Sequence, residues 1–443
     1  MARRGGGGGG ISNSAALRCF VAFAALGTLY LVGYAYSLPG PTEGLVDDDH
    51  GGPSASAPKA SMLRGKAGNS TAGGPRVPSF YVPIELRAVE HGDPRVTLCK
   101  LDFDSYWRDP SKTPMFRDLT TMSKCGKGDR SGSLDDLVAD LPKRGITPLV
   151  PTAFVFHESR VGSTLVANML ASVPTNLVYS ESPPPPIVLN HCRGCTKERQ
   201  LDLLRKLVSL MGASPFHTHL YFKFQSITVP AMTVLAEAFP TTPFIFVYRE
   251  PVQVMMSHFK NGNGRSAPCV REHETAAILG MSQKDAQGSS SESYCAAHLS
   301  MLCEAALEAD AKWGNRALMV DYNSLPGALV AHVVPKHFHV DVSLEDQRRM
   351  VATSKVYSKA RVVAKRAGEW AGDSAQKEKA ASAAVKAAAA ELMEPRQCAA
   401  PAMEGRKPGK TPTTKETEYN KLVAATKAKT GGDDLYHYKD FTV

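Results

Sequence analysis

Short apolar runs alternate with amphipathic stretches through the middle of the chain, and this alternation predicts an α/β fold. Each run has the length of a strand that is buried on both faces of a parallel sheet, with helices packed above and below it in three layers. An amphipathic stretch at 165–170 follows the first run, and further helices are expected over 292–312 and 380–393. The five expected strands cover residues 154–157, 176–180, 220–224, 244–248 and 317–320.

A long apolar run near the N-terminus predicts a membrane segment. Residues 19–38 are uncharged and mainly apolar, and twenty such residues are enough to span a bilayer. Three arginines precede the run within residues 1–18, and acidic residues follow it from Glu43 onward. The positive-inside rule then places residues 1–18 in the cytosol and the rest in a lumen, as in a single-pass type II protein. A cleaved signal peptide remains the alternative, because small residues near 33–37 suit a cleavage site.

The rest of the chain divides by composition into a stem, one folded domain and a tail. Residues 39–80 are rich in Gly, Pro, Ser and Ala, which cannot bury a core, so a disordered stem is expected. A glycosylation sequon lies within it at 69–71. The folded domain is expected over 81–395, and the Lys-, Thr- and Gly-rich residues 396–443 form a low-complexity tail. Within the domain, residues 261–290 are an insertion that either shapes a binding cleft or forms a surface loop.

Charge and cysteine content narrow the possible environments and partners. A net charge of +9 suits an anionic ligand, whereas nucleic-acid binding is not expected because no interleaved aromatic and basic repeat is present. Eight cysteines lie outside the membrane segment, an even number that fits an oxidising lumen. Cys192 and Cys195 have the spacing of a redox or metal pair, but no second pair of zinc-site spacing exists. Structural disulfides are the favoured interpretation, and no metal site is predicted.

The turn after the first strand has the composition of an anion-binding loop. Gly162, Ser163 and Thr164 stand where the strand gives way to a helix, whose first amides and positive dipole end favour a phosphate-like group. The lysine of a nucleotide-triphosphate loop is missing after Gly162, and the nearest cation precedes the glycine by two residues, as Arg160. An ordinary turn with an N-cap residue and a surface arginine would have the same local sequence.

A second candidate anion site lies at the end of the fourth strand. Arg249 follows that strand, and Pro251 suits the first turn of the next helix. Ligands of open α/β sheets bind at this edge of the sheet. Ser257 lies eight residues after Arg249, about two helical turns along, so both side chains can face one pocket.

With these two motifs the chain resembles the sulfotransferases that use 3′-phosphoadenosine 5′-phosphosulfate (PAPS). In that family a [KR]-x-G-[ST]-[ST] loop holds the 5′-phosphosulfate, and an arginine with a serine eight residues later holds the 3′-phosphate. A late basic stretch at 355–361 resembles the family's loop that closes over the nucleotide. The resemblance covers about 153–395 and implies a P-loop-like three-layer fold. The cofactor-binding residues that it implies are Arg160, Val161, Gly162, Ser163, Thr164, Arg249, Ser257, Ser358 and Lys359.

The same resemblance implies a set of catalytic residues. Glu181 follows the second strand, where the Golgi tyrosylprotein sulfotransferases carry the glutamate that acts as general base. Arg160 would steady the charge on the leaving phosphate. Lys223, in the third strand, is the next candidate to stabilise the charge on the leaving phosphate. The alternative is that it is a lysine at a strand end that takes no part in catalysis. If Glu181 is not the base, His157 is the first group to consider.

The resemblance therefore implies a PAPS-dependent sulfotransferase, closest in motif layout to the Golgi tyrosylprotein and carbohydrate enzymes. Its catalytic domain would lie in the Golgi lumen, or be secreted after signal-peptide cleavage, and its acceptor would be a hydroxyl of a protein or glycan. A P-loop nucleotide kinase or NTPase is one alternative, for which the strand-end acid Asp321 could bind a metal, although the absent loop lysine and Arg249 argue against it. A non-catalytic glycan-binding protein on the same fold is the other. The residues leave the acceptor and the oligomeric state open.

Overall fold

A computed structural model describes residues 76–90, 92–192, 194–259, 269, 282–356 and 373–393. The predicted cytoplasmic tail and membrane segment, nearly all of the stem, most of the insertion and the C-terminal tail lie outside these residues. Ser358 and Lys359 also lie outside them. Among the helices of the described part, none has the length and apolar character needed to cross a bilayer.

A five-stranded parallel sheet forms the centre of the described residues. Its strand order is β5-β6-β4-β7-β8, so the first strand of the predicted set lies in the middle. The predicted strands are confirmed, and most of their side chains are buried because helices cover both faces. The strands are β4 Pro151–His157, β5 Asn176–Ser180, β6 His219–Lys223, β7 Phe244–Tyr248 and β8 Ala317–Asp321.

The register of the sheet brings the carboxyl ends of its strands to one edge. Ser180 of β5 pairs with Lys223 of β6, and His157 of β4 pairs with Val247 of β7. Residues that directly follow these strands therefore meet at the edge where ligands of α/β sheets bind.

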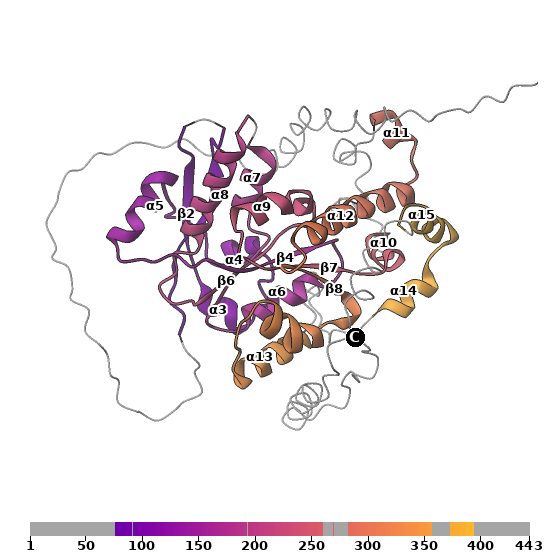
Figure 1. Ribbon diagram of the computed structural model, residues 1–443. Coiled ribbons are helices and arrows are strands. Elements are labelled where there is room, and N and C mark those ends of the chain that lie inside the picture. The colour runs from indigo at the N-terminus through magenta and orange to yellow at the C-terminus, as the bar shows by residue number, and fades with distance from the viewer. Residues whose placement is uncertain are drawn as a thin grey trace, which may run out of the picture. The chain divides into compact units, whose positions relative to one another are not determined.

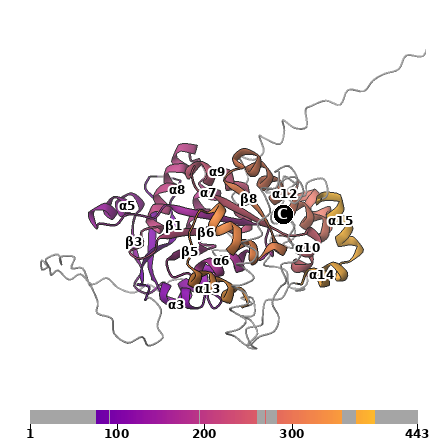
Figure 2. The same ribbon diagram turned by 60° about the horizontal axis from the view of Figure 1, so that its bottom comes forward.

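Helices cover both faces of this sheet. In chain order the helical segments are α3 Phe103–Arg108, α4 Phe116–Met122, α5 Leu134–Lys143, α6 Ser163–Ala171, α7 Pro184–His191, α8 Lys197–Met211, the 3₁₀ segment η2 Ser226–Ala231, α9 Met232–Ala238, α10 Pro251–Phe259, α11 Gln283–Gly288, α12 Ser291–Trp313, the 3₁₀ segment η5 Tyr322–Ser324, the π-helical segment η6 Leu329–His337, α13 Leu344–Ser354, α14 Ser374–Ala380 and α15 Ala383–Met393. Helices α8, α9 and α12 lie on one face of the sheet, and α6 and α13 on the other (Figure 1 and Figure 2). The predicted α/β fold with a central parallel sheet flanked by helices is confirmed.

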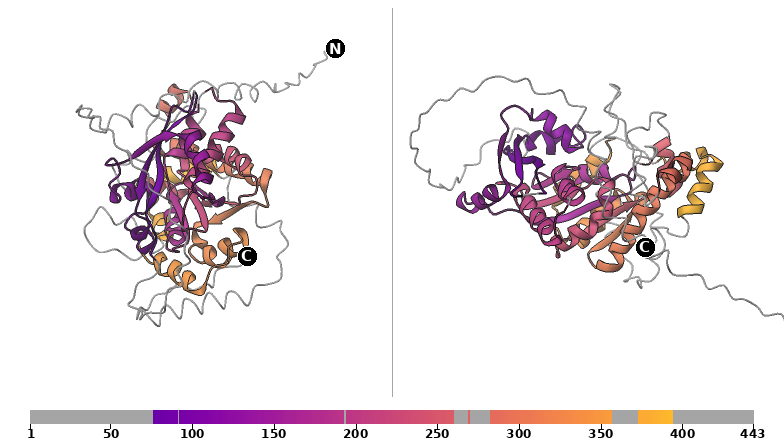
Figure 3. Two further views of the ribbon diagram at one scale, coloured as in Figure 1. Left: turned by 90° about the vertical axis from the view of Figure 1, so that its left-hand side faces the viewer. Right: turned by 90° about the horizontal axis from the view of Figure 1, so that it is seen from above.

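A small antiparallel sheet precedes the central one. It consists of β1 Phe80–Arg87, β2 Arg95–Leu101 and β3 Arg130–Ser133, in that order. It contacts α7 and α8, and the indigo strands lie at the opposite end of the described residues from the yellow α15 (Figure 3). The sequence pattern did not predict this sheet.

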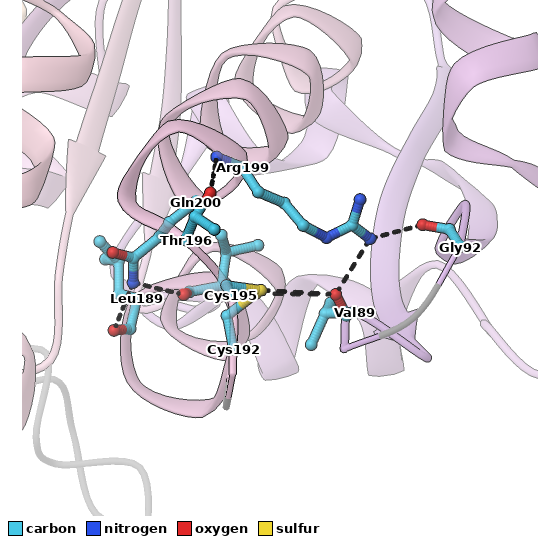
Figure 4. The surroundings of a disulfide bond; sticks show 9 residues. Val89, Gly92, Leu189, Cys192, Cys195, Thr196, Arg199 and Gln200 are labelled. Carbon is cyan, nitrogen blue, oxygen red and sulfur yellow. Dashed lines mark hydrogen bonds between the residues drawn. A yellow bond between two sulfur atoms is a disulfide. The ribbon is translucent and has the colours of Figure 1, made fainter. Parts of the chain in front are cut away.

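Three disulfides lie within the described residues. They join Cys99 to Cys125, Cys192 to Cys195, and Cys269 to Cys295. The Cys192–Cys195 disulfide links the end of α7 to the residue before the N-cap of α8. Because the two sulfur atoms are bonded to each other, this pair is structural rather than a metal site. Both sulfur atoms lie within 3.7 Å of the carbonyl oxygen of Val89, which also accepts a hydrogen bond from Arg199 Nη2 (Figure 4).

Candidate functional site

The loop between β4 and α6 has the backbone geometry of an anion site. Ser159, Arg160 and Gly162 take positive φ angles of 81°, 59° and 80°. Such turn conformations can direct successive backbone amides into one concavity, an arrangement that binds anions. Among the described residues, no acceptor receives a hydrogen bond from the backbone amides of 160–164. These amides and the start of α6 are therefore available to a phosphate-like group.

The side chains of this loop divide into buried and accessible ones. Val161 and Ser163 are buried, whereas Arg160 and Thr164 are half-buried. Within the described part of the chain, the guanidinium of Arg160 makes no hydrogen bond or ion pair. The predicted loop cation is thus one of the accessible members of the loop.

Gly162 cannot be replaced without strain. Its φ of 80° is a left-handed conformation that side chains disfavour, and an added Cβ would lie 3.1 Å from Cδ2 of Tyr322. Tyr322 begins η5, directly after β8, and it is buried. The same ring lies 3.9 Å below the guanidinium carbon of Arg249. One aromatic ring therefore contacts both predicted anion elements, a role that the sequence did not reveal.

Arg249 directly follows β7, but its side chain is hydrogen-bonded to three other residues. Its Nε donates to Gln253 Oε1 at 2.9 Å, and its Nη2 donates to Asp373 Oδ1 at 2.7 Å and to Ser374 Oγ at 3.0 Å. The side chain is 2% exposed. The predicted 3′-phosphate ligand is thus held by a carboxylate and a hydroxyl of the protein itself.

Ser257 lies on the same helix as Gln253, one turn further along α10. Its Oγ donates to the backbone oxygen of Gln253 at 2.9 Å. No hydrogen bond joins Ser257 to Arg249 within the described residues. The structure therefore places Ser257 on α10 and Arg249 just before that helix, with no hydrogen bond between the two predicted 3′-phosphate ligands. On α10, the guanidinium bonds to Gln253 instead.

Glu181 and Lys223, which the sequence suggested separately as the base and as a candidate for the leaving-phosphate charge, form a pair in the structure. Glu181 follows β5 with a positive φ of 60°, and its amide donates to the carbonyl oxygen of Lys223 at 2.7 Å. The Lys223 ammonium and the Glu181 carboxylate form a salt bridge. The Lys223 side chain is 1% exposed and that of Glu181 is 23% exposed, so only the carboxylate is open to an incoming acceptor.

His157, the alternative base, links the loop to the residue after β6 through its two ring nitrogens. Its Nδ1 accepts a hydrogen bond from the Ser159 amide at 2.9 Å, and its Nε2 lies 2.9 Å from the carbonyl oxygen of Phe224. This pattern assigns the neutral tautomer with the proton on Nε2, because a carbonyl only accepts. Both ring nitrogens are thus used in hydrogen bonds, whereas Glu181 Oε1, 3.9 Å from Nε2, belongs to a carboxylate that is partly exposed.

Glu158 is a buried acid in the anion loop that the sequence interpretation left without a role. Burial raises its pKa to about 8, against the effect of the Arg249 amide, which donates to Oε2 at 3.2 Å. The carboxyl groups of Asp321 and Glu250 raise that pKa further by charge repulsion. Its other oxygen lies 3.1 Å from Cys303 Sγ, and Cys303 is itself disulfide-bonded. The sequence shows a glutamate directly after an apolar strand. Only the fold shows that its carboxylate links the loop after β4 to the backbone amide of Arg249.

Asp321, the acid that the kinase alternative requires, has a structural partner. Its Oδ1 accepts the Asn323 amide at 2.6 Å and so caps η5. Burial also raises the pKa of Asp321. The residue therefore acts as a helix cap in this structure, which weakens the case for a metal-binding acid.

Comparisons with known proteins give weak structural similarity. No protein-family model matches the chain, and no curated protein matches its sequence. The solved structures that it resembles include a sulfotransferase, STF9, from Mycobacterium avium, with 9% identity and a TM-score of 0.35 over 58% of this chain and 76% of that one. The sulfotransferase domain of the Synechococcus PCC 7002 olefin synthase has 15% identity and a TM-score of 0.29, over 66% and 97% of the two chains.

A third similar structure is the sulfotransferase domain of the curacin biosynthetic pathway. It has 12% identity and a TM-score of 0.31, covering 62% of this chain and 98% of that one. All three TM-scores are too low to support an inference about function, which therefore depends on the residues of the site.

Proposed function

We propose that the protein is a sulfotransferase that moves a sulfuryl group from PAPS to a hydroxyl of a protein or glycan. The observation that supports this most is the pairing of Glu181 with Lys223 at the sheet edge that also carries the loop after β4. A base beside an anion loop is the minimum that such a transfer needs, because positioning and electrostatics supply the rest.

The donor fits the loop after β4. The free amides of 160–164 and the half-buried Arg160 would hold the 5′-phosphosulfate, and Gly162 keeps the loop close to Tyr322. Arg249 and Ser257 would hold the 3′-phosphate, with Ser358 and Lys359 as further predicted contacts. When bound, the donor supplies an activated sulfuryl group whose leaving group is a phosphate.

The acceptor is expected at the exposed carboxylate of Glu181. Glu181 takes the proton of the acceptor hydroxyl while the new bond from that oxygen to sulfur forms and the bond from sulfur to the bridging phosphate oxygen breaks. Lys223 keeps the carboxylate in place through its salt bridge, and Arg160 with the loop amides meets the negative charge that develops on the departing phosphate.

A lumenal location agrees with the chemistry of the chain. Three disulfides within the described residues suit an oxidising compartment. We therefore propose a Golgi enzyme with a membrane anchor at residues 19–38, or a secreted enzyme if that segment is cleaved. Digestion of the domain by protease in intact microsomes without detergent would contradict the lumenal placement.

The decisive test of function replaces the base. Glu181→Gln keeps the size of the side chain and removes its basicity, so turnover with radiolabelled PAPS should fall by ~10²–10⁴. Affinity for the desulfated nucleotide should stay within a few-fold, because the anion loop is unchanged. Glu308→Gln, an exposed carboxyl on α12, is the matched control and should leave turnover unaltered.

Other outcomes would select an alternative function. Nucleotide binding without transfer to any acceptor in a panel of tyrosine peptides, glycans and small alcohols would favour a non-catalytic binding protein. Tight, magnesium-dependent ATP binding would favour the kinase. Near-normal turnover of Glu181→Gln would remove Glu181 from the role of base.

A further inference from the structure

The guanidinium of Arg249 is enclosed by four groups from three segments of the chain. Gln253 of α10 and the ring of Tyr322 lie on two sides of it, and Asp373 and Ser374 at the start of α14 complete the enclosure. Since the side chain is 2% exposed, no external anion can reach it in this arrangement without displacing one of these groups.

Asp373 is the group with the chemistry of a competing anion. Burial raises its pKa, but hydrogen bonds from Lys377 and Arg249 outweigh that effect and hold the pKa below its usual value. The residue is thus an ionised carboxylate near neutral pH. One oxygen lies 2.7 Å from Arg249 Nη2 and the other 2.7 Å from Lys377 Nζ.

Ser374 adds a second oxygen to the same guanidinium. Its Oγ lies 3.0 Å from Arg249 Nη2 and donates to Asn323 Oδ1 at 3.2 Å. The carboxylate and the hydroxyl together give Arg249 two oxygen acceptors, which a phosphate group would also offer.

We propose that Asp373 competes with the 3′-phosphate of the nucleotide for Arg249 and so determines the affinity and selectivity of that site. The inference rests on the proposed function, because it takes the nucleotide to be 3′-phosphorylated. A phosphate monoester carries more charge than a carboxylate and has three acceptor oxygens, so it can displace Asp373 when α14 moves away. A nucleotide without the 3′-phosphate has nothing to exchange and leaves the ion pair intact. The observed affinity for the 3′-phosphorylated ligand is therefore lower in proportion to the fraction of molecules in which Arg249 is paired with Asp373.

The test uses Asp373→Asn, which keeps the shape of the side chain and removes its charge. Binding of adenosine 3′,5′-bisphosphate and of adenosine 5′-monophosphate is measured by calorimetry. The variant should bind the bisphosphate about five- to twentyfold more tightly than the wild type, while affinity for the monophosphate changes less than about threefold. Asp341→Asn, an exposed aspartate between η6 and α13, removes the same charge and should change neither affinity.

A second measurement uses the unaltered protein, in case the variant does not fold. Adenosine 3′,5′-bisphosphate should increase amide hydrogen exchange in α14, residues 374–380, and the monophosphate should not. Unchanged or increased protection of α14 with the bisphosphate overturns the inference, as does an unchanged or weaker bisphosphate affinity of Asp373→Asn.

The two proposals fail in different ways. Sulfate transfer by the wild type together with unaltered nucleotide selectivity in Asp373→Asn would reject the role of Asp373 and leave the enzyme assignment intact. Selective gain of bisphosphate affinity without transfer would support the role of Asp373 and reject catalysis. If neither protein binds the bisphosphate, the inference about Asp373 is wrong.

Discussion

Glu158→Gln should change how the stability of the protein depends on pH. The carboxyl is 2% exposed, and its pKa is raised from 4.5 to about 8, mainly by burial. The folded protein therefore binds this proton more tightly than the unfolded chain does. The stabilisation of the fold that this bound proton provides is fully present below pH 4.5 and is lost progressively as the pH rises to about 8.

The size of the effect follows from the same shift. Each pKa unit corresponds to about 1.4 kcal/mol, so between pH 5 and pH 7.5 Glu158 should reduce the free energy of unfolding by about 2 to 3 kcal/mol. Glutamine cannot ionise, and its amide oxygen can still accept the Arg249 amide that donates to Glu158 Oε2. The variant and the wild type should therefore be nearly equal in stability at pH 5, and the variant should be more stable at pH 7.5.

Urea unfolding monitored by fluorescence at several pH values measures this difference directly. The quantity to follow is the free energy of unfolding of the variant minus that of the wild type, since other acids whose pKa is raised, such as Asp321 and Glu250, contribute to both proteins. Glu308→Gln serves again as the control for the loss of one exposed charge. A difference that stays constant from pH 5 to pH 7.5, or that falls, would refute the assignment of Glu158 as a buried proton-binding group.

Two further substitutions test the loop. Gly162→Ala places a methyl group 3.1 Å from Tyr322 at a φ of 80°, so it should destabilise the fold by about 1 to 2 kcal/mol and weaken binding of the desulfated nucleotide at least ~10-fold, measured by unfolding and calorimetry; unaltered binding would remove this loop from the donor site. His157→Asn keeps a side-chain acceptor and donor near the loop, so turnover should fall less than ~10-fold, far less than for Glu181→Gln; an equal loss in both variants would make His157 a candidate base again.

The sequence determined the parallel sheet because each of its strands is a local apolar run. Strands β4 to β8 are mostly buried, so the central residues of each strand are mainly apolar, and this pattern is visible without knowing which strands pair. The antiparallel sheet was not predictable in this way. Its strand β3 reads Arg-Ser-Gly-Ser, with no hydrophobic signal, and it is a strand because it pairs with β2.

The sequence also determined the elements of the site. The order of strand, Gly162 and helix predicts a candidate anion loop locally, and Glu181 and Lys223 each lie at or next to the end of a strand that the apolar pattern had located. Parallel pairing then requires those ends to meet, and the salt bridge between the two side chains agrees with that.

Only the tertiary structure decided which groups surround Arg249 and Glu158. Asp373 follows Arg249 by 124 positions in the chain. The Glu158 carboxylate accepts a hydrogen bond from the backbone amide of Arg249, 91 positions further along. No local pattern encodes such pairs, because they depend on how helices and strands from distant segments pack. The pKa of Glu158 likewise depends on removal from water, which is a property of the whole packed fold rather than of the residue.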